Sequence, residues 1–200
     1  MGRRSIDRER KPLTEKAKQW IRELTPLLQD KELDKLTLNE LAELMGKSKS
    51  TIYTYFSTKD EIFLMATLLV LEDLAFVGSK DARSGGDMEL ALRTMLMRIS
   101  EGIEGISIGY LEQIKDHFPE VWLVIDRFTQ QVLANLAEIY EKGMEQGAFK
   151  RFNISLLTAL DQHFVMSIMT NASAFSQQGL SLKDLVKEYL ELRLSALKKS

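Results

Sequence analysis

The chain has 200 residues, 44% of them hydrophobic, and a net charge of −2, which is enough apolar material for one large or two small buried cores. It contains no cysteine and only two histidines, which excludes disulfides and thiolate chemistry and argues against a structural zinc site. The longest apolar run, over residues 62–71, is far shorter than the roughly 18 residues of a membrane span. The basic start has no apolar stretch after it, unlike a signal peptide. We therefore expect a soluble cytoplasmic protein that does not associate with a membrane.

The charge is divided unevenly along the chain. Residues 1–59 carry 13 Lys+Arg and 9 Asp+Glu, whereas residues 60–200 carry 14 and 20. The excess is steepest in residues 1–22, with eight basic side chains against three acidic ones. This asymmetry indicates a basic arm that meets a polyanion, joined to a body that does not. A solvated, disordered tail explains the charge equally well.

The apolar residues recur at helical spacing and no run alternates with period two, which predicts an all-α fold of about nine helices. The first helix is expected over residues 13–29, where Pro26 should kink or end it. Two short helices follow within residues 37–59. A long helix then runs from residue 59 to about 79, with apolar side chains on all sides, as in a fully buried helix. Residues 81–87 form the expected mobile loop.

The second half of the chain is also predicted to be helical, with breaks at glycines. Pro119 suits the first turn of one helix, and Asn153 can cap another. The expected helices span about residues 88–103, 107–117, 119–147, 153–177 and 181–198.

Residues 37–59 contain the motif that carries the function. Thr37 and Glu40 have the spacing of a capping box, which satisfies free amides at a helix start. Gly46 comes where a left-handed residue ends that helix, and Ser48 can cap the next one. Two short helices joined by a tight glycine turn are typical of a helix-turn-helix.

A second capping box, Thr58 with Glu61, is expected to open the long helix. In the second short helix, Ile52 and Phe56 face inward. Hydroxyls and amides at helix starts bind phosphate, and lysines add charge, so this helix is suited to the major groove of DNA. A plain helical hairpin with exposed tyrosines is the alternative. The outward residues are Lys49, Ser50, Thr51, Tyr53 and Tyr55.

The stretch resembles the DNA-binding domain of the TetR family of one-component transcriptional repressors, over about residues 14–65. That family has a Thr cap, an apolar helix, Ala-Gly-Val-Ser, and then Leu-Tyr-x-His/Tyr-Phe-x-x-Lys. The pattern stands here as Thr37, Leu41-Ala42, Gly46, Ser48, Ile52-Tyr53-Thr54-Tyr55-Phe56 and Lys59. Two positions depart from it: Lys47 replaces a small apolar anchor, and Pro26 interrupts the first helix.

The resemblance implies a DNA-binding domain over residues 1–58 and a helical ligand-binding and dimerisation domain over residues 59–200. It implies that Lys49, Ser50 and Tyr53 approach bases, and Lys47 is expected to add a phosphate contact. The residues that would hold phosphates are Thr37, Ser48, Thr51, Tyr55 and Lys59.

The same resemblance implies a homodimer through the helices over about residues 153–177 and 181–198. An apolar stripe on the last helix agrees with this, although packing within one subunit would explain the stripe equally well. A pocket for a small-molecule effector is expected among the helices between residues 60 and 147.

Two of the candidate pocket residues have an alternative reading. Asp126 could be a buried carboxylate or a residue at the solvent edge, and His163 is more often a core or interface residue than a ligand group. The candidates for the pocket lining are Met95, Ile99, Tyr110, Trp122, Asp126 and His163.

No nucleophile–base pair, phosphate-binding glycine loop or metal cluster appears in the sequence, so we expect neither an enzyme nor a cofactor. The sequence predicts a dimeric regulator that binds a double-stranded operator and is released from it by a small-molecule effector. The alternative is an architectural or partner-binding DNA-binding protein on the same fold, which acts without a ligand.

Overall fold

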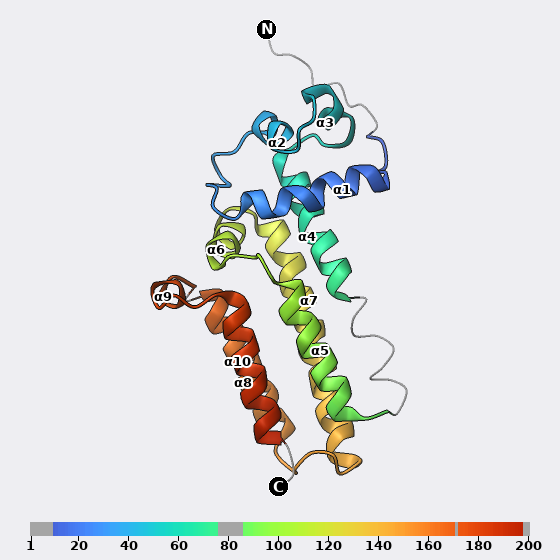
Figure 1. Cartoon of the computed structure of the whole chain (residues 1–200), viewed down its shortest axis with the longest axis vertical. Helices are drawn as coiled ribbons and strands as arrows, with labels where there is room; N and C mark the ends of the chain where they lie inside the picture. Colours follow the sequence, from blue (N-terminus) through green and yellow to red (C-terminus); the bar gives the residue numbers. More distant parts are fainter. Residues whose placement is uncertain (1–9, 76–85, 171, 198–200) are drawn as a thin grey trace.

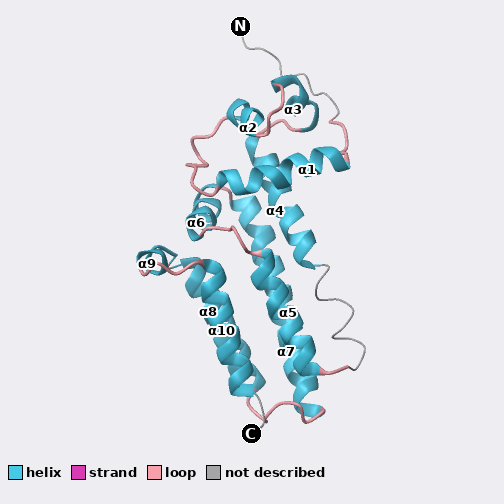
Figure 2. Cartoon of the chain, in the orientation of Figure 1, coloured by secondary structure: helices cyan, strands magenta, loops and turns pink. Residues whose placement is uncertain are grey.

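The computed structural model describes residues 10–75, 86–170 and 172–197. Within these residues it contains ten α-helices, one 3-10 helix and no β-strand (Figure 2), which confirms the all-α prediction. The count exceeds nine because the helix expected over residues 153–177 is divided into two. These are α8 (Ile154–Thr170) and α9 (Ala172–Gln177).

The N-terminal part consists of α1 (Glu15–Leu24), the 3-10 helix η1 (Thr25–Leu28), α2 (Leu38–Leu44) and α3 (Lys49–Tyr55). The hydroxyl of Thr14 caps α1 by accepting from the amide of Ala17. Pro26 lies inside η1, so α1 ends just before the proline, as predicted. Figure 1 shows these elements gathered at one end of the molecule.

Helix α4 (Lys59–Ala75) leaves this end and runs into the rest of the protein (Figure 1). It is not buried all round as predicted, because Leu68 is 39% exposed while Ile62 and Phe63 are fully buried. The expected end of this helix near residue 79 lies outside the described residues. So does most of the expected loop over residues 81–87.

The remaining helices form the body. Helix α7 contacts α4, α5, α6 and α8, and α10 packs against α5. Helices α8 and α10 are in contact, because Arg193 of α10 bonds Asp161 of α8 and the rings of Phe164 and Tyr189 stack. The bounds of the other body helices are α5 (Met88–Gly102), α6 (Ile108–His117), α7 (Pro119–Glu145) and α10 (Leu182–Leu197).

One hydrophobic cluster joins the N-terminal helices to the body. It contains Leu41 and Ile52 from α2 and α3, Phe63 from α4, and Phe118 and Val121 at the start of α7. The rings of Phe63 and Phe118 pack edge to face with centroids 4.7 Å apart. The predicted boundary between residues 58 and 59 therefore does not coincide with a break in packing, because α4 belongs to both parts.

Candidate DNA interface and ligand cavity

The helix-turn-helix is held in shape by short-range hydrogen bonds at its helix starts. The amide of Thr37 donates to the carboxylate of Glu40 at 2.7 Å, and the amide of Glu40 donates back to the Thr37 hydroxyl at 3.3 Å, so the predicted capping box is present. The Thr37 hydroxyl also lies 2.7 Å from the Glu40 carboxylate and donates to it, and this bond, together with the one from the Thr37 amide, lowers the pKa of Glu40 below its usual value. Gly46 has φ +63°, the left-handed conformation that glycine adopts at no steric cost.

The start of α4 is capped differently from the prediction. The hydroxyl of Thr58 accepts from the amide of Glu61 at 3.2 Å, as a cap should. The carboxylate of Glu61, however, accepts from the amide of Ser57 at 2.6 Å. The bond reaches one residue beyond the cap and therefore secures the turn that connects α3 to α4.

The N-terminal end of α3 exposes a group of hydroxyls. The hydroxyl oxygen of Ser48 caps the helix and lies 3.0 Å from that of Ser50 and 2.8 Å from that of Thr51. Ser48, Lys49 and Ser50 are exposed, and Tyr53 is 38% exposed. The Lys49 ammonium lies 5.6 Å from the centroid of the Tyr53 ring. The predicted base-reading residues thus share one surface with two of the predicted phosphate-binding residues.

The sequence reasoning missed Arg10, which joins the chain start to α3. Its guanidinium donates to the carbonyl of Tyr53 and to the hydroxyl of Ser57, both at 2.7 Å. The amide of Lys11 donates to the carbonyl of Thr54 at 3.3 Å. A cation near the last carbonyls of a helix is favourable, so the bonds tie this basic segment to the C-terminal end of α3. The charge excess of residues 1–22 was the available signal.

The side chain of Lys59 does not face outward with this group. Its ammonium donates to the carbonyls of Leu33, at 3.1 Å, and Asp34, and lies 5.7 Å from the centroid of the Phe118 ring. The side chain is half-buried between the loop before α2 and the start of α7. Lys59 therefore serves as an internal link, and the phosphate contact expected of it would require it to leave two carbonyls.

Two other residues predicted to contact phosphate, Lys47 and Tyr55, pack against Trp20. The ammonium of Lys47 lies 4.7 Å from the centroid of the Trp20 ring, a cation–π arrangement. The ring of Tyr55 packs edge to face on the same Trp20 at 6.3 Å. Lys47 and Tyr55 are both half-buried, whereas Thr37 is exposed at the start of α2.

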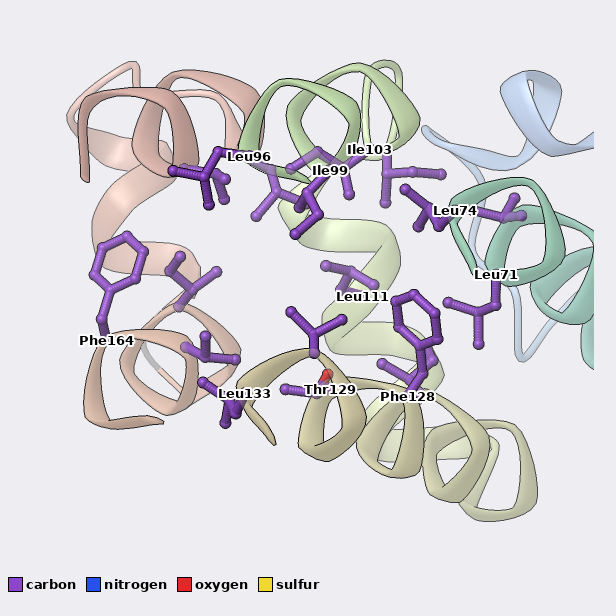
Figure 3. Close-up of a pocket in the computed structure, with 18 of the residues that line it drawn as sticks. Leu71, Leu74, Leu96, Ile99, Ile103, Leu111, Phe128, Thr129, Leu133 and Phe164 are labelled. Carbon is purple, nitrogen blue, oxygen red and sulfur yellow. The ribbon is translucent and has the colours of Figure 1, made fainter. Parts of the chain in front are cut away.

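Apolar side chains of the body surround a cavity of about 200 Å³. Figure 3 shows Leu96, Ile99 and Ile103 from α5 facing Phe128 and Leu133 from α7 across it. Helices α4, α6, α8 and α10 complete the lining, and Thr25 of η1 also reaches it. A concave, mostly apolar space with few polar groups is typical of a small-molecule site.

Two of the six predicted lining residues, Ile99 and Tyr110, line this cavity. The other four do not. Met95 is buried in a neighbouring cluster with α10 and α7, and Trp122 packs against the cluster that joins the two parts of the protein. Asp126 is half-buried away from the cavity and His163 is exposed. The stripe of α7 that faces the cavity passes instead through Ile125, Phe128, Thr129, Val132, Leu133 and Leu136.

A polar cluster that the sequence reasoning missed borders the cavity. Asp161 of α8 is 2% exposed and accepts hydrogen bonds from the hydroxyl of Tyr140, at 2.9 Å, and from that of Tyr189. The guanidinium of Arg193 donates to the same carboxylate at 2.8 Å. The rings of Phe164 and Tyr189 are stacked with centroids 3.7 Å apart. Asp161 is the one carboxylate of α8 and lies between Leu157 and Phe164, which was the signal for this cluster.

Burial suppresses the ionisation of three tyrosines of the body, of which Tyr110 and Tyr189 line the cavity. It raises the pKa of Tyr110 to about 12, although a hydrogen bond with Thr67 acts to lower that pKa. Burial also raises the pKa of Tyr140 and of Tyr189, and the negative charge of Asp161 adds to the effect at both. All three hydroxyls are therefore neutral hydrogen-bonding groups at neutral pH.

Polar contacts connect the cavity helices to the loop that precedes α2. At the start of α6, the amide of Ser107 donates to the side chain of Gln29 at 2.6 Å. Six residues further along, the side chain of Gln113 accepts from the amide of Leu33 at 2.7 Å and donates to the carbonyl of Lys31 at 2.8 Å. A displacement of α6 would therefore be felt at residues 29–33, next to the helix-turn-helix.

Within the part of the chain that the structure describes, none of the helices is both long and apolar enough to cross a membrane. The same residues include no group of three His, Cys, Asp or Glu side chains placed to hold a metal ion.

Comparison with known proteins identifies relatives of the chain. Residues 25–66 match the sequence model of the bacterial regulatory proteins of the tetR family. Over 122 residues the chain is 24% identical to the uncharacterized HTH-type transcriptional regulator YvaF of Bacillus subtilis. This match covers 60% of the chain and 64% of YvaF, which is less than two thirds of that relative's length.

Solved structures resemble the chain over most of its length. The TetR-family regulator PfmR from Thermus thermophilus matches with a TM-score of 0.66 and 23% identity, over 90% of this chain and 99% of PfmR. The regulator FadR from Bacillus subtilis, solved with stearoyl-CoA, matches with a TM-score of 0.65 and 17% identity, over 89% and 97% of the two chains. The ketosteroid regulator KstR2 of Mycobacterium tuberculosis matches with a TM-score of 0.65 and 15% identity, over 96% of this chain and 100% of KstR2.

These matches cover both parts of the molecule. The sequence match falls on the helix-turn-helix and the first half of α4, and the structural matches extend the likeness to the helical body. The proteins named are all regulators rather than enzymes. Residues 25–66 of the chain therefore match the tetR family model, and the chain as a whole shares the fold of the solved TetR-family regulators.

Proposed function

We propose that the protein is a dimeric transcriptional repressor that releases its operator when an apolar small molecule fills the cavity. In this proposal residues 1–58 read DNA and residues 59–200 sense the ligand and form the dimer. Helix α4 belongs mechanically to both parts, because it starts at the helix-turn-helix and its second half lines the cavity.

The observation that carries the proposal is that the helices lining the cavity also hold the helix-turn-helix. Thr67 and Leu71 of α4 and Tyr110 of α6 line the cavity. The same α4 begins at Lys59, whose ammonium bonds the loop before α2, and the same α6 bonds that loop through Gln113. A ligand that alters the spacing of α4 and α6 would change the position of α2 and α3, which is the differential contact that allosteric release requires.

The proposed DNA contacts follow the exposure of the predicted residues. Lys49, Ser50 and Tyr53 would face base edges in the major groove, and Arg10 would hold the basic chain start beside them. Lys47 and Lys59 are left with internal partners. The phosphate contacts are assigned to Thr37, Ser48, Thr51 and Tyr55.

The proposed dimer uses α8 and α10. Leu156 and Leu160 lie one turn apart on α8 and are 61% and 49% exposed, and Leu192 of α10 is 69% exposed. Large apolar side chains exposed together on adjacent helices are typical of an interaction surface. A symmetric pair would place its two recognition helices about 34–36 Å apart, or a multiple of that, to match turns of the groove.

An apolar effector is favoured by the lining and by the neighbours. One structural neighbour was solved with stearoyl-CoA, another is a ketosteroid regulator, and a third is a fatty acid degradation regulator from Bacillus halodurans. The stearoyl-CoA complex and the two names are properties of those proteins. They support only the inference that this fold can be adapted to lipid-like molecules, as the lining of the cavity also indicates.

Footprinting on genomic DNA, with and without a panel of apolar metabolites, tests the proposal. We expect protection of a palindromic site by the protein alone, and loss of that protection with at least one member of the panel. Protection that persists with a ligand shown by calorimetry to occupy the cavity would contradict ligand-controlled release. That result would favour the ligand-independent DNA-binding protein.

A further inference from the structure

We propose that the cavity takes a neutral, largely apolar molecule with a single hydrogen-bonding group, which is placed against Thr129, and that it rejects anionic and cationic head groups. This inference rests on the proposed ligand site and names the chemical class that the site would accept. Three observations carry it: the charges in the lining, the partners of the lining's polar groups, and the size of the cavity.

The first observation concerns the charges. Among the described residues that line the cavity there is no Lys, Arg or His, and Asp161 is the one acidic side chain. A carboxylate or phosphate inside the cavity would therefore find no counter-ion. Burying an ion without a partner is costly in a low-dielectric interior, so an anionic head group would have to remain outside.

The second observation is that Asp161 is already neutralised by the protein. Its carboxylate accepts from Tyr140, Tyr189 and Arg193, and the guanidinium of Arg193 also donates to the Tyr189 hydroxyl at 2.7 Å. An entering ammonium group would have to displace these donors to reach the carboxylate. The cluster consequently offers no free negative charge to a cationic ligand, and its stacked rings form an apolar wall.

The remaining polar groups single out Thr129. The hydroxyl of Thr25 donates to the carbonyl of Ile21 at 3.2 Å, and Tyr110 and Thr67 bond each other. Thr129 is half-buried on α7, and Figure 3 shows its hydroxyl oxygen on the cavity side of the helix. For this hydroxyl the described part of the chain supplies no hydrogen bond, so it is the polar group of the lining that is available to a ligand.

The cavity size limits the ligand as well. At about 200 Å³ the cavity is only somewhat larger than an engineered apolar cavity of about 150 Å³ that binds benzene. It suits a compact molecule such as a medium-chain alcohol. A bulky polar carrier group would have to lie outside it.

Three probes that share one alkyl chain and differ in the head group test the ligand class: 1-octanol, octanoate and octylammonium. Each is titrated into the full-length protein at neutral pH by calorimetry. We expect octanol to bind, and the two ions to bind at least about tenfold more weakly, because each must bury an unpaired charge. The inference is overturned if octanoate or octylammonium binds as tightly as octanol, or if octanol does not bind.

Two variants test the location. Thr129→Val keeps the shape of the side chain and replaces its hydroxyl with a methyl group, so octanol affinity should fall about three- to tenfold. Leu133→Trp should abolish octanol binding by filling the cavity. Thr158→Val, the same change on α8 outside the lining, should leave the affinity unchanged. Unchanged affinity in Thr129→Val would contradict the role given to that hydroxyl, even if the tryptophan variant failed to fold.

The test separates this inference from the proposed function. If octanol occupies the cavity but the operator stays bound, ligand-controlled release fails and the ligand class stands. If an anion binds inside the cavity and releases the operator, the proposed repressor mechanism stands and the ligand class is wrong.

Discussion

The recognition surface of α3 and the cavity in the body treat their polar groups in opposite ways. At α3, Ser48, Lys49 and Ser50 are exposed, and the hydroxyls bond mainly to one another. In the cavity wall, Asp161 is almost fully buried and receives donors from three side chains. The first surface leaves polar groups available to a polyanion, whereas the second satisfies its own and presents an apolar interior. The two binding events therefore depend on different forces.

The largest expected contrast is in the response to salt. Binding of DNA releases condensed counter-ions, so affinity for the operator should fall about 10³-fold between about 50 and 200 mM salt. Binding of octanol in the cavity should change less than about twofold, because no unpaired charge is involved. Fluorescence anisotropy and calorimetry at matched salt concentrations measure the two. Equal salt dependence of DNA binding and octanol binding would contradict the proposed difference in forces between the two regions.

Substitution of the buried carboxylate should have the largest effect on stability. Asp161→Ala leaves the Arg193 guanidinium and two tyrosine hydroxyls without their acceptor, and we expect a loss of about 3–5 kcal/mol in the free energy of unfolding. Ser50→Ala on the exposed surface should change it by less than about 0.5 kcal/mol. Urea denaturation of both variants makes the comparison. A loss below 1 kcal/mol for Asp161→Ala would show that the cluster is dispensable.

Alkaline pH should also act on the body. Burial raises the pKa of Tyr110 to about 12, above the usual value of 10.0, so the neutral phenol stabilises the folded state. That contribution is fully present below pH 10 and is lost between pH 10 and 12, by about 3 kcal/mol. Denaturation across this range should show less loss in Tyr110→Phe than in the wild type. An identical slope in the two proteins would mean that Tyr110 ionises as readily when folded as when unfolded.

On the recognition surface, the test is specificity rather than stability. Lys49→Ala should cost about 1–3 kcal/mol on the preferred operator and much less on sites with other bases. Tyr55→Phe, which removes one hydroxyl assigned to a phosphate, should weaken binding on all sequences alike. Competition binding with operator variants measures both profiles. An equal loss of affinity on all sequences with Lys49→Ala would mean that Lys49 contacts the phosphate backbone of the DNA and not the bases.

The two regions also differ in how far the sequence could predict them. The helix-turn-helix depends on contacts between residues three or four apart, such as Thr37 with Glu40, and these are visible as spacing. The internal bonds of Lys59 could not be predicted in this way, because its partners, Leu33 and Asp34, are 26 and 25 residues away.

The cavity depends on contacts between distant helices, which periodicity does not encode. A helix such as α7 has apolar residues on more than one face. Spacing alone therefore could not show that Phe128, and not Trp122, lines the cavity. The pairing of Asp161 with Arg193 spans 32 residues. His163 of α8 was predicted to line the pocket, although Asp161, two residues before it, is the buried titratable group of that helix.

The most direct test of the central claim is the affinity of one effector for the protein, measured with and without bound operator. If the cavity and the helix-turn-helix are coupled through α4 and α6, the effector binds the DNA-loaded protein more weakly. The factor should equal that by which the effector weakens operator binding, about 5- to 150-fold for typical couplings. Equal affinity of the effector for free and DNA-bound protein would contradict the account.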